Sequence, residues 1–356
     1  MKIKPFFCFL SILIWGLSPL VIRAQELGNS LYRIEEITIP AGEFSVVGDL
    51  YIPLKGEKHP AAVWVHGSGP LTRQIMAPLL KPQIEIFLKA GFAFFLDDIP
   101  GAGGSTGEIK SVYQDRALIL AGEIAALKKR FDILPGRIGM VGMSQAGIVM
   151  PMASTLTTDI SFMIAEACVA ESAYRQDAYL LEKLMICEGR PAEEAQKAAR
   201  FQRERYETMN YPEYLAAVEF LDKNEYSVMI GQNDPGMSEE KFKLRDRSPA
   251  KLGSFYDPMP VVSGLRFPIL ALFGEKDHNI NLVQGYDAYR LAFQKARNPL
   301  NQVEMIPNAN HSLYEAETGC VRELMAQVTS GKPLYGPQVL NIISAWLDKL
   351  KASFQL

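Results

Sequence analysis

A serine in a Gly-x-Ser-x-Ala pentapeptide is the first residue in this sequence that could do chemistry. Ser144 lies between Gly142 and Ala146, after an apolar run at 138–142 and before a helix-like run at 148–156. Such a tight strand-to-helix turn tolerates only small residues at the two flanking positions, and it lifts the hydroxyl clear of the sheet. Amides at the start of the next helix favour negative charge. The pattern indicates a nucleophile; a glycine-rich turn without a catalytic role is the alternative.

A proton acceptor for this serine is expected later in the chain. A neutral imidazole can take the serine proton and pass it to the leaving group. Of the four histidines, His311 directly follows the last short apolar strand. We interpret His66 as structural, and we expect His59 and His278 to be poorly placed for this role. His311 is therefore the predicted base.

A carboxylate should orient that base and stabilise its protonated form. Asp277 follows an apolar run at 269–273, where a strand end is expected. Glu275 is the competing carboxylate, and a plain surface turn is the alternative. The order Ser144, Asp277, His311 is the order in which α/β-hydrolases carry their triad.

Two backbone N–H groups are expected to stabilise the oxyanion. One is the amide of Gln145, which follows the serine. The second is expected from the His66-Gly67-Ser68-Gly69 loop, with Ser68 as the predicted donor. An ordinary glycine turn is the alternative for this loop. Gly101–Gly104 could suggest a dinucleotide or phosphate loop, but it matches neither pattern.

The elements that position these residues alternate between apolar strands and helical runs. Two strands at 34–40 and 44–52 predict an antiparallel entry hairpin. The remaining runs predict an α/β fold: a mostly parallel sheet with helices on both faces. Predicted strands lie at 61–65, 92–96, 138–142, 160–168, 267–273 and 303–306; predicted helices lie at 75–90, 112–131, 282–296 and 337–351, with a kink or break at Pro82. Ligand sites in such sheets lie at the carboxyl ends of the strands.

One long interval interrupts the alternation. Residues 172–265 show three helical runs, at 173–187, 191–208 and 211–223, and no convincing buried strand. We interpret this interval as a helical cap inserted between two parts of a core, at 25–171 and 266–356. An independent second domain is the alternative.

Three segments carry a family resemblance. His66–Pro70 resembles the oxyanion loop, Asp98–Ser105 resembles an Asp-x-x-Gly-x-Gly-x-Ser segment, and Gly142–Gly147 resembles a Gly-His-Ser-Gln-Gly-Gly elbow. The chain looks like a secreted serine hydrolase of the α/β-hydrolase superfamily, in the esterase and prolyl-oligopeptidase-like branch, over about residues 34–356. Met143 and Ala146 depart from the elbow without removing a reacting group.

The N-terminus predicts a secretory signal peptide at 1–24. Lys2 and Lys4 precede an apolar run at 6–20, and Ala24 is the small residue before the predicted cleavage point. An uncleaved anchor is the alternative, although a spanning helix needs about 20 apolar residues. Cleavage would change the formal charge from −3 to −6, because two lysines and Arg23 are lost. We therefore expect a secreted or periplasmic protein without a membrane span or a nucleic-acid partner.

The expected function is hydrolysis of a small to medium carboxylic ester, or of a related acyl bond, through an acyl-enzyme without a cofactor. An aminopeptidase, acyl-peptide hydrolase or acyltransferase could use the same triad, and a non-catalytic binding protein could keep the fold. No cysteine pattern supports a metal site. Pairing among Cys168, Cys187 and Cys320 is left open, as are the natural substrate and the oligomeric state.

Overall fold

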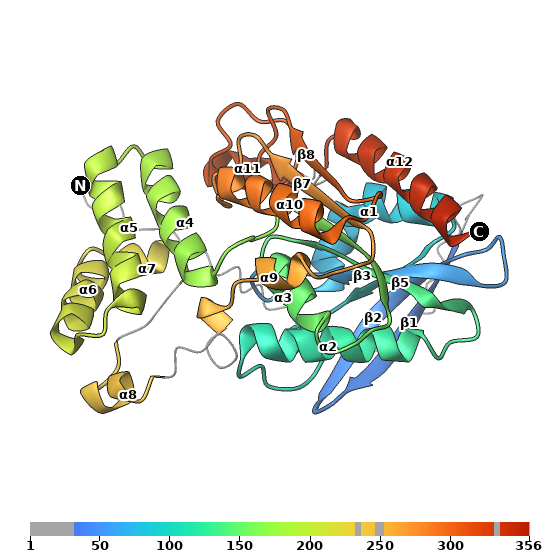
Figure 1. Cartoon of the computed structure of the whole chain (residues 1–356), viewed down its shortest axis with the longest axis horizontal. Helices are drawn as coiled ribbons and strands as arrows, with labels where there is room; N and C mark the ends of the chain where they lie inside the picture. Colours follow the sequence, from blue (N-terminus) through green and yellow to red (C-terminus); the bar gives the residue numbers. More distant parts are fainter. Residues whose placement is uncertain (1–31, 232–235, 246–252, 331–334, 356) are drawn as a thin grey trace, which may run out of the picture. The chain divides into compact units, whose positions relative to one another are not determined.

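A single twisted sheet organises the molecule (Figure 1). The structure is a computed structural model, and it describes residues 32–231, 236–245, 253–330 and 335–355. Within these residues the sheet has eight strands in the order β1-β2-β4-β3-β5-β6-β7-β8. The predicted signal peptide and its cleavage point lie outside the described residues.

The sheet is antiparallel at one edge and parallel elsewhere. β1 pairs with β2 and β2 with β4 antiparallel, and every later pairing is parallel. The predicted entry hairpin and mostly parallel sheet are therefore confirmed. The strands are β1 Tyr32–Ala41, β2 Phe44–Pro53, β3 His59–Val65, β4 Ala93–Asp97, β5 Ile133–Met143, β6 Ile160–Glu166, β7 Ile269–Gly274 and β8 Gln302–Ile306.

Side-chain alternation along the strands builds two apolar cores, one on each face. In β3, Ala61 and Val63 enter one core, whereas Ala62 and Trp64 enter the other. The first core is covered by α2 Val112–Leu127, α3 Ala146–Ala153 and α10 Leu282–Ala296. The second is covered by α1 Arg73–Lys89 and α12 Pro337–Phe354. Helices therefore cover both faces of the sheet, as expected, and the ends of the strands are the part that they leave uncovered.

One local prediction needs correction, and one helix was not predicted. The expected kink or break at Pro82 is not a break, because α1 continues as one helix through both Pro78 and Pro82. Its buried face, which includes Leu80, Ile84 and Phe87, packs against the sheet and offsets the missing backbone hydrogen bonds. The helix α11 Val321–Thr329 was not predicted, although Val321, Leu324, Met325 and Val328 have the spacing of an amphipathic helix; none of its side chains is fully buried.

The interval between β6 and β7 is helical in its described part, with its own small core. The three predicted runs are helices α4 Ala173–Cys187, α5 Ala192–Glu207 and α6 Tyr211–Lys223. Shorter elements follow: α7 Tyr226–Met229, α8 Glu239–Lys243, the 3-10 helix η1 Gly253–Phe255 and α9 Met259–Val262. Leu181, Ala198 and Leu221 form part of that core. The assignment of 172–265 as a cap stays a prediction; its last helix, α9, contacts α3 and α10.

A disulfide joins this interval to the second part of the core. Cys187 ends α4 and Cys320 precedes α11; their Cα atoms are 5.7 Å apart and 133 residues separate them. Cys168 is a buried free thiol. The pairing left open by the sequence is thus Cys187 with Cys320. Among the described residues, no helix combines the length and apolar character needed to cross a membrane.

Candidate active site

Ser144 lies in strained backbone between β5 and α3. Its φ is +60°, in the left-handed region that a residue with a side chain rarely adopts. Its amide donates to the carbonyls of Glu166 and Ala167, both at 3.1 Å, and its carbonyl accepts from the amide of Val169 at 2.9 Å. These hydrogen bonds, to the end of β6 and the residues just after it, hold Ser144 in the left-handed conformation.

The small residues around Ser144 have a steric reason. A Cβ at Gly142 would lie 2.6 Å from both Ala146 Cβ and the carbonyl oxygen of Val65, so the turn closes only over glycine there. A Cβ at Gly147 would lie 2.2 Å from the carbonyl oxygen of Val169. Ala146 is fully buried, and its methyl group fits against Gly142, which has no Cβ. The departure from glycine at position 146 therefore leaves the turn intact.

Asp277 and His311 meet at the carboxyl ends of β7 and β8. His311 Nδ1 lies 2.8 Å from Asp277 Oδ2. A carboxylate only accepts hydrogen bonds, so Nδ1 carries the proton and Nε2 is left as the basic nitrogen. Asp277 Oδ1 accepts from the amides of Asn279 at 2.7 Å and Ile280 at 3.1 Å, which fixes the carboxylate in its own turn. The structure thus brings the predicted acid and base into direct contact.

The loop that carries His311 is held by a buried asparagine that the sequence reasoning missed. Asn310 Oδ1 accepts from the Ser312 amide at 3.0 Å and from the Ser312 hydroxyl at 2.8 Å. Gly274 lets this loop approach β7, because a Cβ there would lie 2.4 Å from the carbonyl oxygen of Asn310. An asparagine beside the candidate base, in a short loop after a strand, was the available signal.

Ser144 and His311 line the same pocket, of about 300 Å³. Gly67, Ser68 and Gln145 also line it, so both predicted oxyanion donors lie on residues of this pocket. A Cβ built on Gly67 would be 3.4 Å from Ser144 Cβ, so the loop passes directly beside the serine. The structure therefore gathers the five predicted site residues: four around one pocket, and Asp277 behind His311.

The rest of the pocket wall is largely apolar, and part of it comes from the predicted cap. The helix α4 contributes Ala173, Gln176, Asp177 and Leu180. Gln176 also ties α4 to the core, since its Nε2 donates to the carbonyl oxygen of Asn279 at 2.5 Å. Apolar side chains that line the pocket are Trp64, Leu71, Met76, Met143, Ile148, Val169, Ala173, Leu180 and Ile280. Such a wall suits an apolar acyl group with a few polar contacts.

The competing residues occupy other positions. Glu275 accepts a hydrogen bond from the Asn308 amide at 2.8 Å, so it supports the neighbouring turn. His278 Nε2 lies 3.0 Å from the carbonyl oxygen of Thr318. His59 begins β3, and its Nδ1 lies 3.2 Å from the carbonyl oxygen of Gly91.

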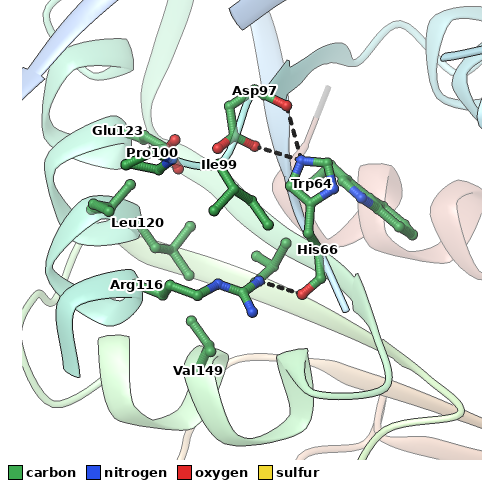
Figure 2. A pocket seen from close by; sticks show the side chains of 11 residues that line it. Trp64, His66, Asp97, Ile99, Pro100, Arg116, Leu120, Glu123 and Val149 are labelled. Carbon is green, nitrogen blue, oxygen red and sulfur yellow. Dashed lines mark hydrogen bonds and ion pairs between the residues drawn. The ribbon is translucent and has the colours of Figure 1, made fainter. Parts of the chain in front are cut away.

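His66 is buried and bound to another part of the sheet. Its Nε2 lies 2.9 Å from the carbonyl oxygen of Asp97 and 3.1 Å from Asp97 Oδ1 (Figure 2). Both partners are acceptors, so Nε2 carries the proton. The position agrees with the structural interpretation of His66.

The side chains of the Asp98–Ser105 segment bind backbone amides, both within the segment and in neighbouring elements. Asp98 Oδ1 accepts from the Arg73 amide and Oδ2 from the Gly104 amide, each at 2.8 Å. Ser105 Oγ accepts from the Val47 amide at 2.8 Å. The carboxylate thus takes the Gly104 amide, which a phosphate loop would direct at its ligand.

One group of side chains has metal-ligand character. Atoms of Cys187, His278 and Cys320 lie within 4.8 Å of one another. Both sulfur atoms form the disulfide, however, so the thiolates that a zinc ion would need are not present in this state.

A buried carboxyl belongs to Glu166, the last residue of β6, whose carbonyl oxygen accepts from the Ser144 amide. Glu166 Oε2 accepts from the Tyr335 hydroxyl at 2.6 Å, and Oε1 is bonded to Gln83 Nε2. Burial raises the pKa of Glu166 to about 8, although both hydrogen bonds act in the opposite direction. The group is therefore protonated at neutral pH.

A strained serine on a strand-to-helix turn, with an Asp–His pair at the strand ends of a mostly parallel sheet, is the arrangement found in α/β-hydrolases. The chain belongs to the X-Pro dipeptidyl-peptidase (S15) family, whose model matches residues 43–302. No curated protein matches the sequence significantly.

Solved structures share the fold at low identity. An esterase from Pyrococcus furiosus matches with a TM-score of 0.55 and 12% identity, over 89% of this chain and 91% of its own. An esterase from Pyrobaculum calidifontis gives 0.54 and 14%, over 90% and 84%. The α/β hydrolase GrgF from Penicillium gives 0.51 and 15%, over 90% and 99%. At these identities the likeness shows the fold, and the substrate has to be argued from the site.

Proposed function

We propose that the protein hydrolyses a carboxylic ester, or a related acyl bond, through an acyl-enzyme on Ser144. His311 Nε2 takes the serine proton as the hydroxyl attacks the carbonyl, and it then protonates the leaving group. Asp277 holds the ring in the tautomer that leaves Nε2 basic. Water, activated by the same imidazole, releases the acid and regenerates the serine.

The observation that carries this proposal is the Asp277–His311 contact of 2.8 Å, together with a strained Ser144 on the same pocket as His311. The Gln145 amide and the Ser68 amide are the proposed oxyanion donors, each of which would contribute on the order of 3 kcal/mol to the transition state. The apolar wall around Leu71 and Ile148 supports an apolar acyl group.

A second candidate is a peptidase that removes residues from a free N-terminus. The carboxylate side chain of Asp177 lines the pocket and could attract a substrate ammonium, and the matching family is named for X-Pro dipeptidyl-peptidases. The same triad would then cleave an amide bond. An acyltransferase would differ only in the final acceptor.

Export through a signal peptide cleaved after Ala24 is also part of the proposal. The Cys187–Cys320 disulfide supports an oxidising compartment, where such bonds persist.

Two substrate panels separate the candidates. Nitrophenyl esters of increasing acyl length and X-Pro nitroanilides with free or acetylated N-termini are assayed with wild type, Ser144→Ala and Asp177→Asn. The esterase proposal expects ester turnover that is lost in Ser144→Ala and kept in Asp177→Asn. Turnover confined to free N-termini and lost in Asp177→Asn would favour the peptidase. Ester turnover that survives Ser144→Ala would refute the triad.

A further inference from the structure

Arg116 of α2 is a buried cation that reaches the loop beside Ser144. Its side chain is directed from the helix toward the end of β3 (Figure 2), and the residue is only 8% exposed. Nη2 donates to the carbonyl oxygen of His66, and Nη1 donates to the carbonyl oxygen of Gly67 at 3.0 Å. One guanidinium therefore holds two consecutive carbonyls of the proposed oxyanion loop.

The second of these carbonyls shares its peptide plane with the proposed oxyanion donor. The C=O of Gly67 and the N–H of Ser68 belong to one peptide unit, and in a trans peptide they point in opposite directions. No cis peptide occurs among the described residues. Since Arg116 holds the oxygen end of this unit, the orientation of the Ser68 N–H is set from behind the loop.

Arg116 also contacts the residue that carries the other proposed donor. Nη1 donates to Gln145 Oε1 at 2.5 Å. Gln145 is the N-cap of α3 and directly follows Ser144. The same nitrogen thus links the loop after β3 to the side chain of the first residue after the nucleophile.

The charges around Arg116 keep it ionised although it is buried. Burial lowers the pKa of Arg116 to about 10, with Asp97, Tyr113 and Glu123 acting in the opposite direction. The pKa of Glu123 is raised well above its ordinary value, chiefly by burial and then by Asp97, while Arg116 acts in the opposite direction. A cation close to the Gly67 and His66 carbonyls polarises these peptide units and makes their N–H ends stronger donors.

We propose that Arg116 is a positioning residue for the oxyanion hole: its guanidinium fixes the Gly67–Ser68 peptide and Gln145 so that two N–H groups converge on the tetrahedral intermediate. This inference rests on the proposed function. The guanidinium touches neither substrate nor reacting atoms, and it acts through the groups that it holds. A lysine could not fully replace Arg116. A single ammonium lacks the planar fork that reaches the carbonyls of His66 and Gly67 and the side-chain oxygen of Gln145 together.

The test compares Arg116→Lys and Arg116→Gln with wild type in ester hydrolysis and in binding of an aryl boronic acid, which forms a tetrahedral adduct on the serine. Both variants should lose kcat by 10- to 100-fold, with Lys less affected than Gln. Affinity for the boronic acid should fall by a similar factor, while KM changes less than threefold. Millimolar guanidinium should partly restore kcat in Arg116→Ala, and ammonium should not.

Arg130→Lys is the matched control. Arg130 follows the same helix and makes a fork to Glu35 and Asp132 away from the pocket. The substitution Arg130→Lys should lower the free energy of unfolding without changing kcat. Gln145→Met keeps the backbone amide and removes the side-chain hydrogen bond to Arg116. This variant should lower kcat by 3- to 10-fold. It tests the inference independently if the Arg116 variants do not fold.

Unchanged kcat and boronate affinity in folded Arg116 variants, or in Gln145→Met, would overturn the inference. So would a loss confined to KM, which would mark Arg116 as a substrate-binding residue. Wild type that neither hydrolyses any acyl substrate nor binds the boronic acid would instead refute the proposed function, so the two failures are distinguishable.

Discussion

Replacing Glu166 by glutamine should stabilise the protein increasingly as the pH rises. Glu166 is fully buried, and its pKa is raised from 4.5 to about 8 by burial. In this pH range the unfolded chain loses the proton while the folded protein keeps it. The folded state therefore binds more protons, and the stability that Glu166 contributes is complete below pH 4.5 and is lost as the pH rises toward 8.

The magnitude follows from the size of the shift. Each pH unit between the two pKa values costs about 1.4 kcal/mol, so the accumulated loss at pH 7 is about 3 kcal/mol. Glutamine has nearly the same shape and cannot ionise, and it can still pair with Tyr335 and Gln83. In the wild type, a protonated Glu166 could donate to Gln83 Oε1 after rotation of that amide; this oxygen has no hydrogen-bond partner in the structure.

The assay is guanidinium chloride unfolding of wild type and Glu166→Gln between pH 5 and pH 7.5, with the disulfide intact. All other titrating groups are shared, so the difference in unfolding free energy between the two proteins isolates Glu166. That difference should grow in favour of the variant by about 3 kcal/mol over this range. A constant difference, or wild type gaining on the variant as the pH rises, would refute the reasoning.

Three further perturbations test other parts of the site. Asp277→Asn should lower kcat on the order of 10³- to 10⁴-fold with the fold retained, because an amide can donate to Nδ1 and so favour the wrong tautomer; a loss below tenfold in ester assays would argue against the pair. Cys187→Ser should lower the unfolding free energy by up to about 5 kcal/mol, since the bond closes a long loop, and a denaturation midpoint equal to that of wild type would contradict this. Gly142→Ala should lower both the melting temperature and the fraction of serine that reacts with a phosphonate probe, because the new methyl group overlaps Val65 and Ala146. Unchanged values for both would contradict the steric argument for glycine at position 142.

Much of the fold follows from local patterns that survive in the structure. Short apolar runs between helical runs predicted every strand of the sheet, and residues that follow strand ends must meet at one edge. For this reason Ser144, Asp277 and His311 could be grouped although up to 167 positions separate them.

What could not be predicted depends on tertiary contacts. Arg116 and Glu123 are charges on the buried face of α2, and such charges inside an apolar helical stripe were the only signal. The Cys187–Cys320 pairing needs the path of α4 relative to the loop before α11. Glu166 ends a largely apolar strand, and its partners come from α1 and from the segment before α12.

The most direct measurement is the site of covalent modification by a fluorophosphonate. Intact-mass and peptide mass spectrometry of the treated protein should place one adduct on Ser144, formed at a rate that falls at least 100-fold in His311→Ala. An adduct on another residue, or equal rates in the folded wild type and His311→Ala, would contradict a serine activated by that histidine.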